Sequence, residues 1–289
     1  MTTLRLRSAA KINLTLGVGS RRADGYHEID SIVQTVGLWD ELILEPTPGA
    51  IEVRCNWPRL ESGRNLVARA AELLRDAYRH SSGARIRLRK VVPTGAGLGG
   101  GSANAAAALV GLARLWELSV STEELIALGQ QLGADVPLFL SGGLQRMQGI
   151  GERLTPLPPP PSWWTVIVKP RASIATSWAY EALDRVPQRH SPTQEAMLVA
   201  LREGNLSKCS QLLSNDFEEV VHKAYPSVAQ ARQGLREAGV AGVMMTGSGS
   251  AVFGLFASRE ECETAMAKIT GDGSVFLAPF CRNGWEFDA

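Results

Sequence analysis

Residues 93–112 read PTGAGLGGGSANAAAALVGL, and this stretch says more about the fold than any other part of the chain. Glycine occupies five of the seven positions from Gly95 to Gly101. It tolerates positive φ and lets other atoms approach the backbone closely. The alanine-rich run that follows predicts a helix whose first amides point toward an anion. We therefore expect a phosphate-binding loop rather than a mobile surface loop, which is usually rich in Ser, Asn and Asp.

Two other phosphate-binding motifs fit this stretch less well. A Walker A loop needs a lysine directly after its last glycine, and a serine stands there instead. The dinucleotide pattern G-x-G-x-x-G is present at Gly95, Gly97 and Gly100, with Glu117 near the distance expected of an acidic ribose ligand. However, residues 84–92 (ARIRLRKVV) alternate apolar side chains with arginines, which predicts a strand with one solvated face. The first strand of a dinucleotide fold is buried on both faces, so we disfavour that fold.

Composition narrows the class of protein. With 289 residues, of which 45% are hydrophobic, the chain can bury a full core and predicts one large or two fused domains. Its 30 basic and 29 acidic residues nearly cancel, so no overall field attracts nucleic acid or an anionic membrane. Any anion site is therefore local.

Cysteine usage and hydropathy predict the compartment. The four cysteines are scattered without a C-x-x-C pair, which indicates reduced thiols rather than a metal site or a disulfide frame. They are Cys55, Cys209, Cys262 and Cys281. The N-terminal stretch MTTLRLRSAAKINLTL lacks a continuous apolar segment, and no run reaches the roughly 18 apolar residues that a membrane helix needs. We expect a soluble, cytoplasmic protein with no membrane partner.

Hydrophobic periodicity predicts a mixture of strands and helices without internal repeats. Strands are expected over residues 4–16, 29–36, 41–45 and 164–169, and two strands around a glycine turn over residues 243–256. Helices are expected over residues 65–78, 122–132, 194–203 and 205–213, besides the helix after the glycines. The run TPLPPPPSWW at 155–164 cannot continue a helix or a central strand. We place a lobe boundary there, between residues 1–157 and 162–289.

Three ordered motifs resemble the GHMP superfamily of small-molecule kinases. They are AKINLTLGV near the N-terminus, the glycine stretch itself, and MTGSGSAVFGLF in the second half. The resemblance spans essentially the whole chain and implies an α+β fold of two lobes, with ATP bound under the glycine loop in the cleft between them. Residues 1–157 would then form the N-terminal, ATP-binding domain and residues 162–289 the C-terminal domain.

Further segments resemble one branch of this superfamily, whose members phosphorylate a hydroxyl of an alcohol that carries cytidine diphosphate, in isoprenoid precursor synthesis. They are RRADGYHEIDSIVQTV, GADVPLFLSGG, GIGERLTPL and NDFEEVV. The chain departs from the usual pattern at Ala103, where many relatives have a second serine, and in LQRMQ at 144–148. Neither departure touches a proposed catalytic group.

The resemblance implies that Asp135 and Lys11 are catalytic. Phosphoryl transfer to an alcohol needs an acceptor for the hydroxyl proton and compensation of charge. Asp135 lies beside an apolar Val-Pro-Leu-Phe run that can hold a carboxylate in a partly desolvated cleft, although the residue alone is equally typical of a helix cap. Lys11 is flanked by apolar residues and would be costly to bury without a carboxylate or phosphate. By the same resemblance Lys11 orients Asp135, with Asn13 on the same side of the strand.

ATP-binding residues follow mainly from the glycine stretch. We expect a missing side chain at Gly99 to leave room for phosphate oxygens. Ser102 and Asn104 can cap the helix or face a phosphate and Mg²⁺. Asn65 and Leu66 resemble the family segment near the adenine, although Asn65 is also an ordinary N-cap. The full ATP-binding set is Asn65, Leu66, Pro93, Gly95, Gly97, Leu98, Gly99, Gly100, Gly101, Ser102 and Asn104. The implied cofactors are ATP and Mg²⁺, with no metal ligands assigned.

The other end of the cleft is expected to bind the cytidine alcohol. Tyr26 and His27 follow a turn and would present a ring and an imidazole to a cytosine base. Without the resemblance they could simply decorate that turn. Tyr180 matches an aromatic position that stacks on the base, with Thr176 nearby, and Thr246 of the third motif would close the cleft. The substrate set is Asn13, Tyr26, His27, Thr176, Tyr180 and Thr246.

Two alternatives remain open from the sequence. The same fold could phosphorylate homoserine or mevalonate, although neither offers a base to stack on the aromatic residues. The strand RIRLRK could instead belong to a non-enzymatic RNA-binding module, which the near-neutral charge disfavours. We expect small molecules and no nucleic acid as partners. A monomer and a homodimer are equally compatible with the sequence.

Overall fold

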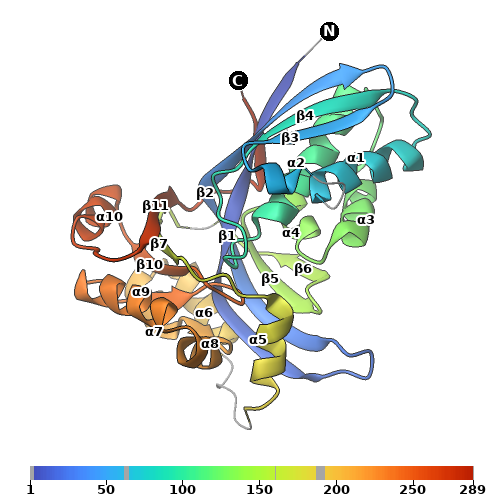
Figure 1. Cartoon of the computed structure of the whole chain (residues 1–289). Helices are drawn as coiled ribbons and strands as arrows, with labels where there is room; N and C mark the ends of the chain where they lie inside the picture. Colours follow the sequence, from blue (N-terminus) through green and yellow to red (C-terminus); the bar gives the residue numbers. More distant parts are fainter. Residues whose placement is uncertain (1–2, 62–64, 160, 187–192, 289) are drawn as a thin grey trace.

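Two long antiparallel strands, β1 (Leu4–Arg21) and β2 (His27–Thr47), run through the centre of the molecule (Figure 1). The computed structural model describes residues 3–61, 65–159, 161–186 and 193–288. The two strands predicted at 29–36 and 41–45 are one continuous strand. Gly37 and Leu38 are unpaired extra residues between them, because Ala10 pairs with Val36 while Ala9 pairs with Trp39. This bulge lets a single strand change direction without ending.

The larger sheet has the order β12-β1-β2-β4-β3, and β5, β6 and β8 extend it. These additional strands are β3 (Ile51–Cys55), β4 (Gly83–Arg89), β5 (Leu144–Gly149), β6 (Arg153–Pro156), β8 (Ser214–Asn215) and β12 (Trp285–Phe287). In β4, Ile86 and Leu88 are buried while the alternating arginines are exposed. The prediction of a strand with one solvated face is therefore confirmed.

In the described part of the first lobe, four α-helices and a 3₁₀ turn accompany the sheet. They are η1 (Pro58–Leu60), α1 (Leu66–Ala77), α2 (Gly100–Leu115), α3 (Thr122–Leu132) and α4 (Val136–Ser141). The four alanines at 105–108 in α2 are fully buried, and their small size lets this helix approach both α1 and β1 closely. A capping box between Ser121 and Glu124 begins α3, which confirms the helix predicted at 122–132.

The second lobe contains a four-stranded sheet of order β11-β7-β10-β9 with helices around it (Figure 1). Its strands are β7 (Trp164–Pro170), β9 (Val243–Met245), β10 (Val252–Phe256) and β11 (Gly273–Pro279). Its helices are α5 (Thr176–Leu183), α6 (Gln194–Arg202), α7 (Leu206–Leu212), α8 (Glu218–Ala224), α9 (Pro226–Glu237) and α10 (Arg259–Met266). The predicted strands β7, β9 and β10 and helices α6 and α7 are confirmed.

The two lobes share the central strand β1. Both β8 and β12 follow the proline run in sequence, yet each pairs with β1 of the larger sheet. Ala9 also donates its backbone N–H to the carbonyl of Gly284, which extends this connection. Pro160, within the proline run, lies outside the described residues, and the boundary at 157–162 stays a prediction. The architecture as a whole is the expected α+β arrangement.

Candidate active site

A cleft of about 820 Å³ opens between the lobes, beneath the glycine segment. Its walls come from β1 and β2, the glycine segment, the residue before α4, helix α5 and the turn after β9. Most of the predicted site residues lie in its lining: Lys11, Asn13, Tyr26, His27, Leu66, Pro93, Gly95, Gly97, Leu98, Gly99, Gly100, Gly101, Ser102, Asp135, Thr176 and Tyr180. Positions separated by more than a hundred residues in sequence thus share one cavity.

The glycine segment is held between the two lobes by backbone contacts. On one side, the N–H of Lys11 donates to the carbonyl of Leu98 at 3.0 Å. On the other side, the N–H of Ala251 donates to the carbonyl of Ala96 at 3.1 Å. Gly97 has φ +76°, and a Cβ there would lie 2.1 Å from the carbonyl oxygen of Thr246. Glycine is required at this position because both the backbone angle and the close approach exclude a side chain.

Gly99 occupies the N-cap position of α2, where glycine fits both the backbone angle and the packing. Its φ is +70°, and a Cβ would lie 2.6 Å from Cζ of Phe139 and 3.1 Å from Cγ of Lys11. The missing side chain therefore makes room for the side chains of Phe139 and Lys11, and the expected room for phosphate oxygens stays a prediction. The first residues of α2 nevertheless line the cleft, where the unpaired amides of a helix N-terminus favour an anion.

Lys11 is buried in the floor of the cleft on β1. Its Nζ donates to Oδ1 of Asn13 at 2.5 Å, which confirms that the two side chains share one face of the strand. Burial lowers the pKa of Lys11, and the negative charge of Asp135 acts in the opposite direction. Lys11 and Asp135 are therefore electrostatically coupled across the cleft, as an orienting pair would require.

Asp135 occupies the N-cap position of α4, yet its side chain makes no capping hydrogen bond. The carboxylate is half-buried and lines the cleft instead. Burial, with the charge of Asp135 as a second cause, raises the pKa of Tyr180 to about 12. Asp135 thus acts on groups of both lobes, Lys11 in the first and Tyr180 in the second. An ordinary cap would not combine these properties.

Aromatic and imidazole groups gather at the other end of the cleft. The rings of His27 and Tyr180 stack with centroids 4.9 Å apart, and Phe217 meets Tyr180 edge-on at 4.9 Å. Nε2 of His27 lies 2.7 Å from Oδ1 of Asp184. Tyr26 is 60% exposed, the largest exposed fraction of any large hydrophobic side chain among the described residues. This end can bind a flat, polar ring.

Three predicted site residues lie behind the cleft wall. Asn65 caps α1, accepting from the N–H of Val67 at 2.9 Å, so its ordinary structural role is the one observed. The prediction that Asn104 faces a phosphate is wrong, because its side chain is buried and its amide bonds Ser8 and other interior groups. Thr246 is fully buried, and its Oγ1 accepts from the N–H of Asn13. It supports the floor of the cleft and does not line it.

Other cleft residues were not predicted from the sequence. They are Arg21, Lys90, Ser177, Glu181, Asp184 and Phe217, among others. A helical signal could have found Asp184, because it follows Tyr180 by four residues and so lies one turn further along the same face. Lys90 carries no comparable signal. In the sequence it is only the last polar residue of 84–92, the arginine-rich stretch that predicts a strand with one solvated face.

Disulfides, clusters of metal-binding side chains and membrane-spanning helices are not found among the described residues. All four cysteines are free there, and no group of three or more His, Cys, Asp or Glu side chains could hold a metal ion. None of the helices built from those residues has the length and apolar character needed to traverse a bilayer.

Comparison with known proteins shows which proteins this chain is similar to. Residues 65–143 match the GHMP kinases N terminal domain, and residues 197–275 match the GHMP kinases C terminal domain. A curated 4-diphosphocytidyl-2-C-methyl-D-erythritol kinase of Pelotomaculum thermopropionicum is 43% identical over 261 residues, or 90% of this chain and 91% of that protein. The enzyme of the same name from Caldicellulosiruptor saccharolyticus is 40% identical over 96% of this chain and 97% of its own.

Solved structures agree with these relatives. A crystal structure of 4-(cytidine 5'-diphospho)-2C-methyl-D-erythritol kinase matches with a TM-score of 0.83 at 35% identity, covering 96% of this chain and 98% of that one. A mevalonate kinase of L. major in complex with R-mevalonate matches with a TM-score of 0.77 over 97% of each chain, at 18% identity. The second similarity shows the shared fold alone.

Proposed function

We propose, from the premise that the chain belongs to the GHMP kinases and to the 4-diphosphocytidyl-2-C-methyl-D-erythritol kinase family within them, that its cleft transfers the γ-phosphate of ATP to the 2-hydroxyl of that cytidine alcohol. The chain is accordingly an ATP-dependent kinase of isoprenoid precursor synthesis. The product would be the 2-phosphate of the alcohol, with ADP as the second product.

The transfer step assigns separate roles to Asp135 and Lys11. The substrate hydroxyl would lose its proton to the carboxylate of Asp135 while its oxygen forms a bond to the γ-phosphorus, and the bond between that phosphorus and the β–γ bridging oxygen would break. The Lys11 ammonium would stabilise charge on the attacking oxygen and hold the carboxylate in place. Their electrostatic coupling, together with the burial of Lys11, supports this assignment.

The nucleotide end would use the start of α2. Amides of Gly100, Gly101 and Ser102 would bind phosphate oxygens, and Leu66 would contact the base. Hydroxyl and carboxylate oxygens of Ser102 and Asp135 both line the cleft, and these hard donors fit Mg²⁺, which usually keeps several waters and binds through few protein ligands plus phosphates. When bound, Mg²⁺ would neutralise negative charge on the phosphates.

The substrate end distinguishes this proposal from the alternatives. Tyr26, His27 and Tyr180 offer aromatic and imidazole surface that homoserine and mevalonate cannot use. The RNA-binding alternative depends on the arginines of β4, but Arg85, Arg87 and Arg89 pair with glutamates of the neighbouring strands β3 and β2. Their charge is thus largely compensated. Reduced thiols support a cytoplasmic location, and either a monomer or a homodimer would satisfy the site.

The single observation that carries the proposal is the meeting of Lys11, Asp135 and the start of α2 in one cleft with the His27–Tyr180 pair. ADP release should be measured with the cytidine alcohol, mevalonate and homoserine as acceptors at equal concentration. We expect turnover with the cytidine alcohol and negligible turnover with the other two. An equal or greater kcat/KM for either acyclic acceptor would contradict the substrate assignment.

A further inference from the structure

A buried polar cluster lies directly behind the start of α2. It contains Asp40 of β2, Lys90 beyond β4 and Asn104 of α2, and all three side chains are almost completely buried. Nζ of Lys90 pairs with Oδ2 of Asp40 and donates to Oδ1 of Asn104 at 3.1 Å. Nδ2 of Asn104 donates to the same Oδ2 of Asp40 at 2.8 Å. The three groups therefore form a closed triangle of hydrogen bonds.

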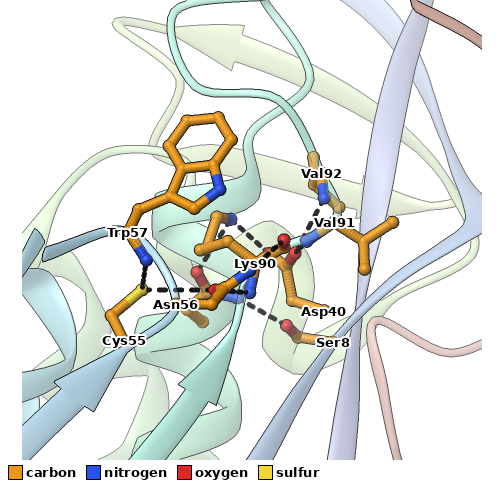
Figure 2. Close-up of polar contacts among 9 residues, drawn as sticks. Ser8, Asp40, Cys55, Asn56, Trp57, Lys90, Val91 and Val92 are labelled. Carbon is orange, nitrogen blue, oxygen red and sulfur yellow. Dashed lines mark hydrogen bonds and ion pairs between the residues drawn. The ribbon is translucent and has the colours of Figure 1, made fainter.

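The same cluster fixes the backbone that enters the glycine segment. Oδ1 of Asp40 accepts from the N–H groups of Val91 and Val92 at 2.6 and 2.8 Å (Figure 2). The backbone of Lys90 is held from the other side by Asn56, whose amide accepts from its N–H at 2.7 Å and donates to its carbonyl at 3.1 Å. The residues just before Pro93 thus have their polar groups satisfied by side chains of β2 and of the segment after β3.

Lys90 also touches the first turn of α2. A Cβ at Gly100 would lie 3.0 Å from Nζ of Lys90, so the ammonium packs against the backbone of that residue. Asn104 lies one turn further along the same helix. The ammonium therefore connects the entry of the glycine segment with the helix that leaves it. These two chain segments flank the amides that face the cleft.

Charge explains why a lysine is needed at the centre of this cluster. A buried carboxylate beside the start of α2 would repel a phosphate bound there, unless a cation compensates it. Lys90 supplies this compensation within hydrogen-bond contact of Asp40. Because its ammonium bonds Asp40 and Asn104, it acts on the nucleotide site through the backbone segments that these residues hold.

We propose that Lys90 is a positioning residue of the nucleotide site, which joins both ends of the glycine segment through Asp40 and Asn104 and neutralises the carboxylate behind it. The inference rests on the proposed kinase function, because it assumes that the start of α2 binds the phosphates of ATP. It predicts a selective loss of nucleotide affinity when Lys90 changes. The cytidine alcohol, bound at the far end of the cleft, should be unaffected.

The decisive experiment compares two ligands on one variant. In Lys90→Met, we expect the Kd for ADP, measured by isothermal titration, to rise by about 10- to 100-fold, and the Kd for the cytidine alcohol to stay within about threefold of the parent. The KM for ATP should rise in parallel. Leu74→Ala serves as the control, because this buried α1 residue does not line the cleft but its loss also destabilises the core.

Two further variants distinguish the effect of the uncompensated charge on Asp40 from the effect of the lost hydrogen bonds to α2. Asn104→Ala also provides a test if Lys90→Met does not fold. Asn104→Ala leaves the Lys90–Asp40 pair intact but releases α2, and it should weaken ADP binding by a smaller factor with the same selectivity. Adding Asp40→Asn to Lys90→Met removes the uncompensated charge while an acceptor for the Val91 and Val92 amides remains. This double variant should bind ADP more tightly than Lys90→Met alone.

The outcomes distinguish this inference from the function on which it rests. If the parent protein binds no ADP, the proposed kinase function is wrong. If the parent binds ADP but Lys90→Met and Asn104→Ala bind it within twofold of the parent, the positioning role is wrong. Equal weakening of both ligands, matched by Leu74→Ala, would also overturn it, because that pattern indicates a general loss of stability.

Discussion

At the scale of single residues, the chemistry depends on Asp135 and Lys11. Replacing Asp135 with Asn preserves its size but removes the proton acceptor and the charge that faces Lys11. We expect kcat to fall by roughly 10²- to 10⁴-fold, while the Kd values for ATP and the alcohol change far less. Both dissociation constants should be measured directly, since KM need not report binding. A kcat within a few-fold of the parent would leave Asp135 as a helix-terminal residue without a catalytic role.

The coupling between the two residues makes a separate prediction. Lys11→Met should also be severely impaired, because the variant loses the cation that compensates charge at the reacting oxygen. Since the two groups act as one unit, the double variant should be little slower than the worse single variant. Single-turnover rates for the three variants measure this. Multiplicative losses would show that Lys11 and Asp135 contribute independently.

At the scale of elements, the glycine segment gives a test with an internal control. Gly97→Ala forces a side chain into left-handed backbone and against the carbonyl of Thr246, which should cost about 1–2 kcal/mol in backbone strain alone and displace the segment from the second lobe. Gly101→Ala lies in the first turn of α2, where a Cβ meets only Leu66 at 3.7 Å. Urea unfolding should show a loss of stability for Gly97→Ala only. Equal behaviour of the two variants would argue against the contact with Thr246.

Elements with a clear local signal could be predicted from the sequence. The alternation in β4 and the glycine-to-alanine transition at α2 are both properties of short windows, and each is confirmed. Helix α4 was missed because it has six residues and Pro137 in its first turn. Strand β5 was missed because its sequence, LQRMQG, lacks the regular polar–apolar alternation of a strand and ends in glycine. Burial there comes from neighbouring elements, which a local window does not contain.

The same limit applies to the candidate site: contacts between residues close in sequence could be predicted, and contacts between distant residues could not. The spacing of Lys11 and Asn13 on one strand was sufficient to predict that their side chains lie together. The direction of Asn104 could not be predicted, because position on a helix does not reveal which face meets the cleft and which meets Asp40. Thr246 was misplaced for a similar reason, since the contact of its turn with Asn13 joins residues 233 positions apart.

At the scale of the whole molecule, stability should depend on the protonation of His222. Burial, aided by the charges of Arg232 and Arg236, lowers the pKa of His222 to about 4, from about 6.5 in an unfolded chain, although Oε1 of Glu218 lies 3.8 Å from its Nε2. The folded state therefore binds fewer protons than the unfolded state between these two pH values. This stabilisation is fully present above pH 6.5 and is lost as the pH falls toward 4.

The expected size of this effect is about 2 kcal/mol between pH 7.5 and pH 5. The free energy of unfolding should be measured in urea at both values for the parent and for His222→Gln. The decrease between the two pH values should be smaller in the variant by that amount, because the other titrating groups are common to both proteins. An identical decrease would show that His222 titrates normally in the folded state.

The pairing of β1 with β12 has a consequence for how the chain is made. Arg7 and Glu286 meet in this pair although they are 279 residues apart. At a synthesis rate of roughly 5–20 residues per second, the interval between them is about 15 to 55 seconds. During this time one edge of β1 lacks its final neighbour, and an unpaired strand edge is a template for wrong partners. Folding of the first lobe on the ribosome therefore leaves its central sheet open until the last strand emerges, which makes the nascent chain a natural client for chaperones.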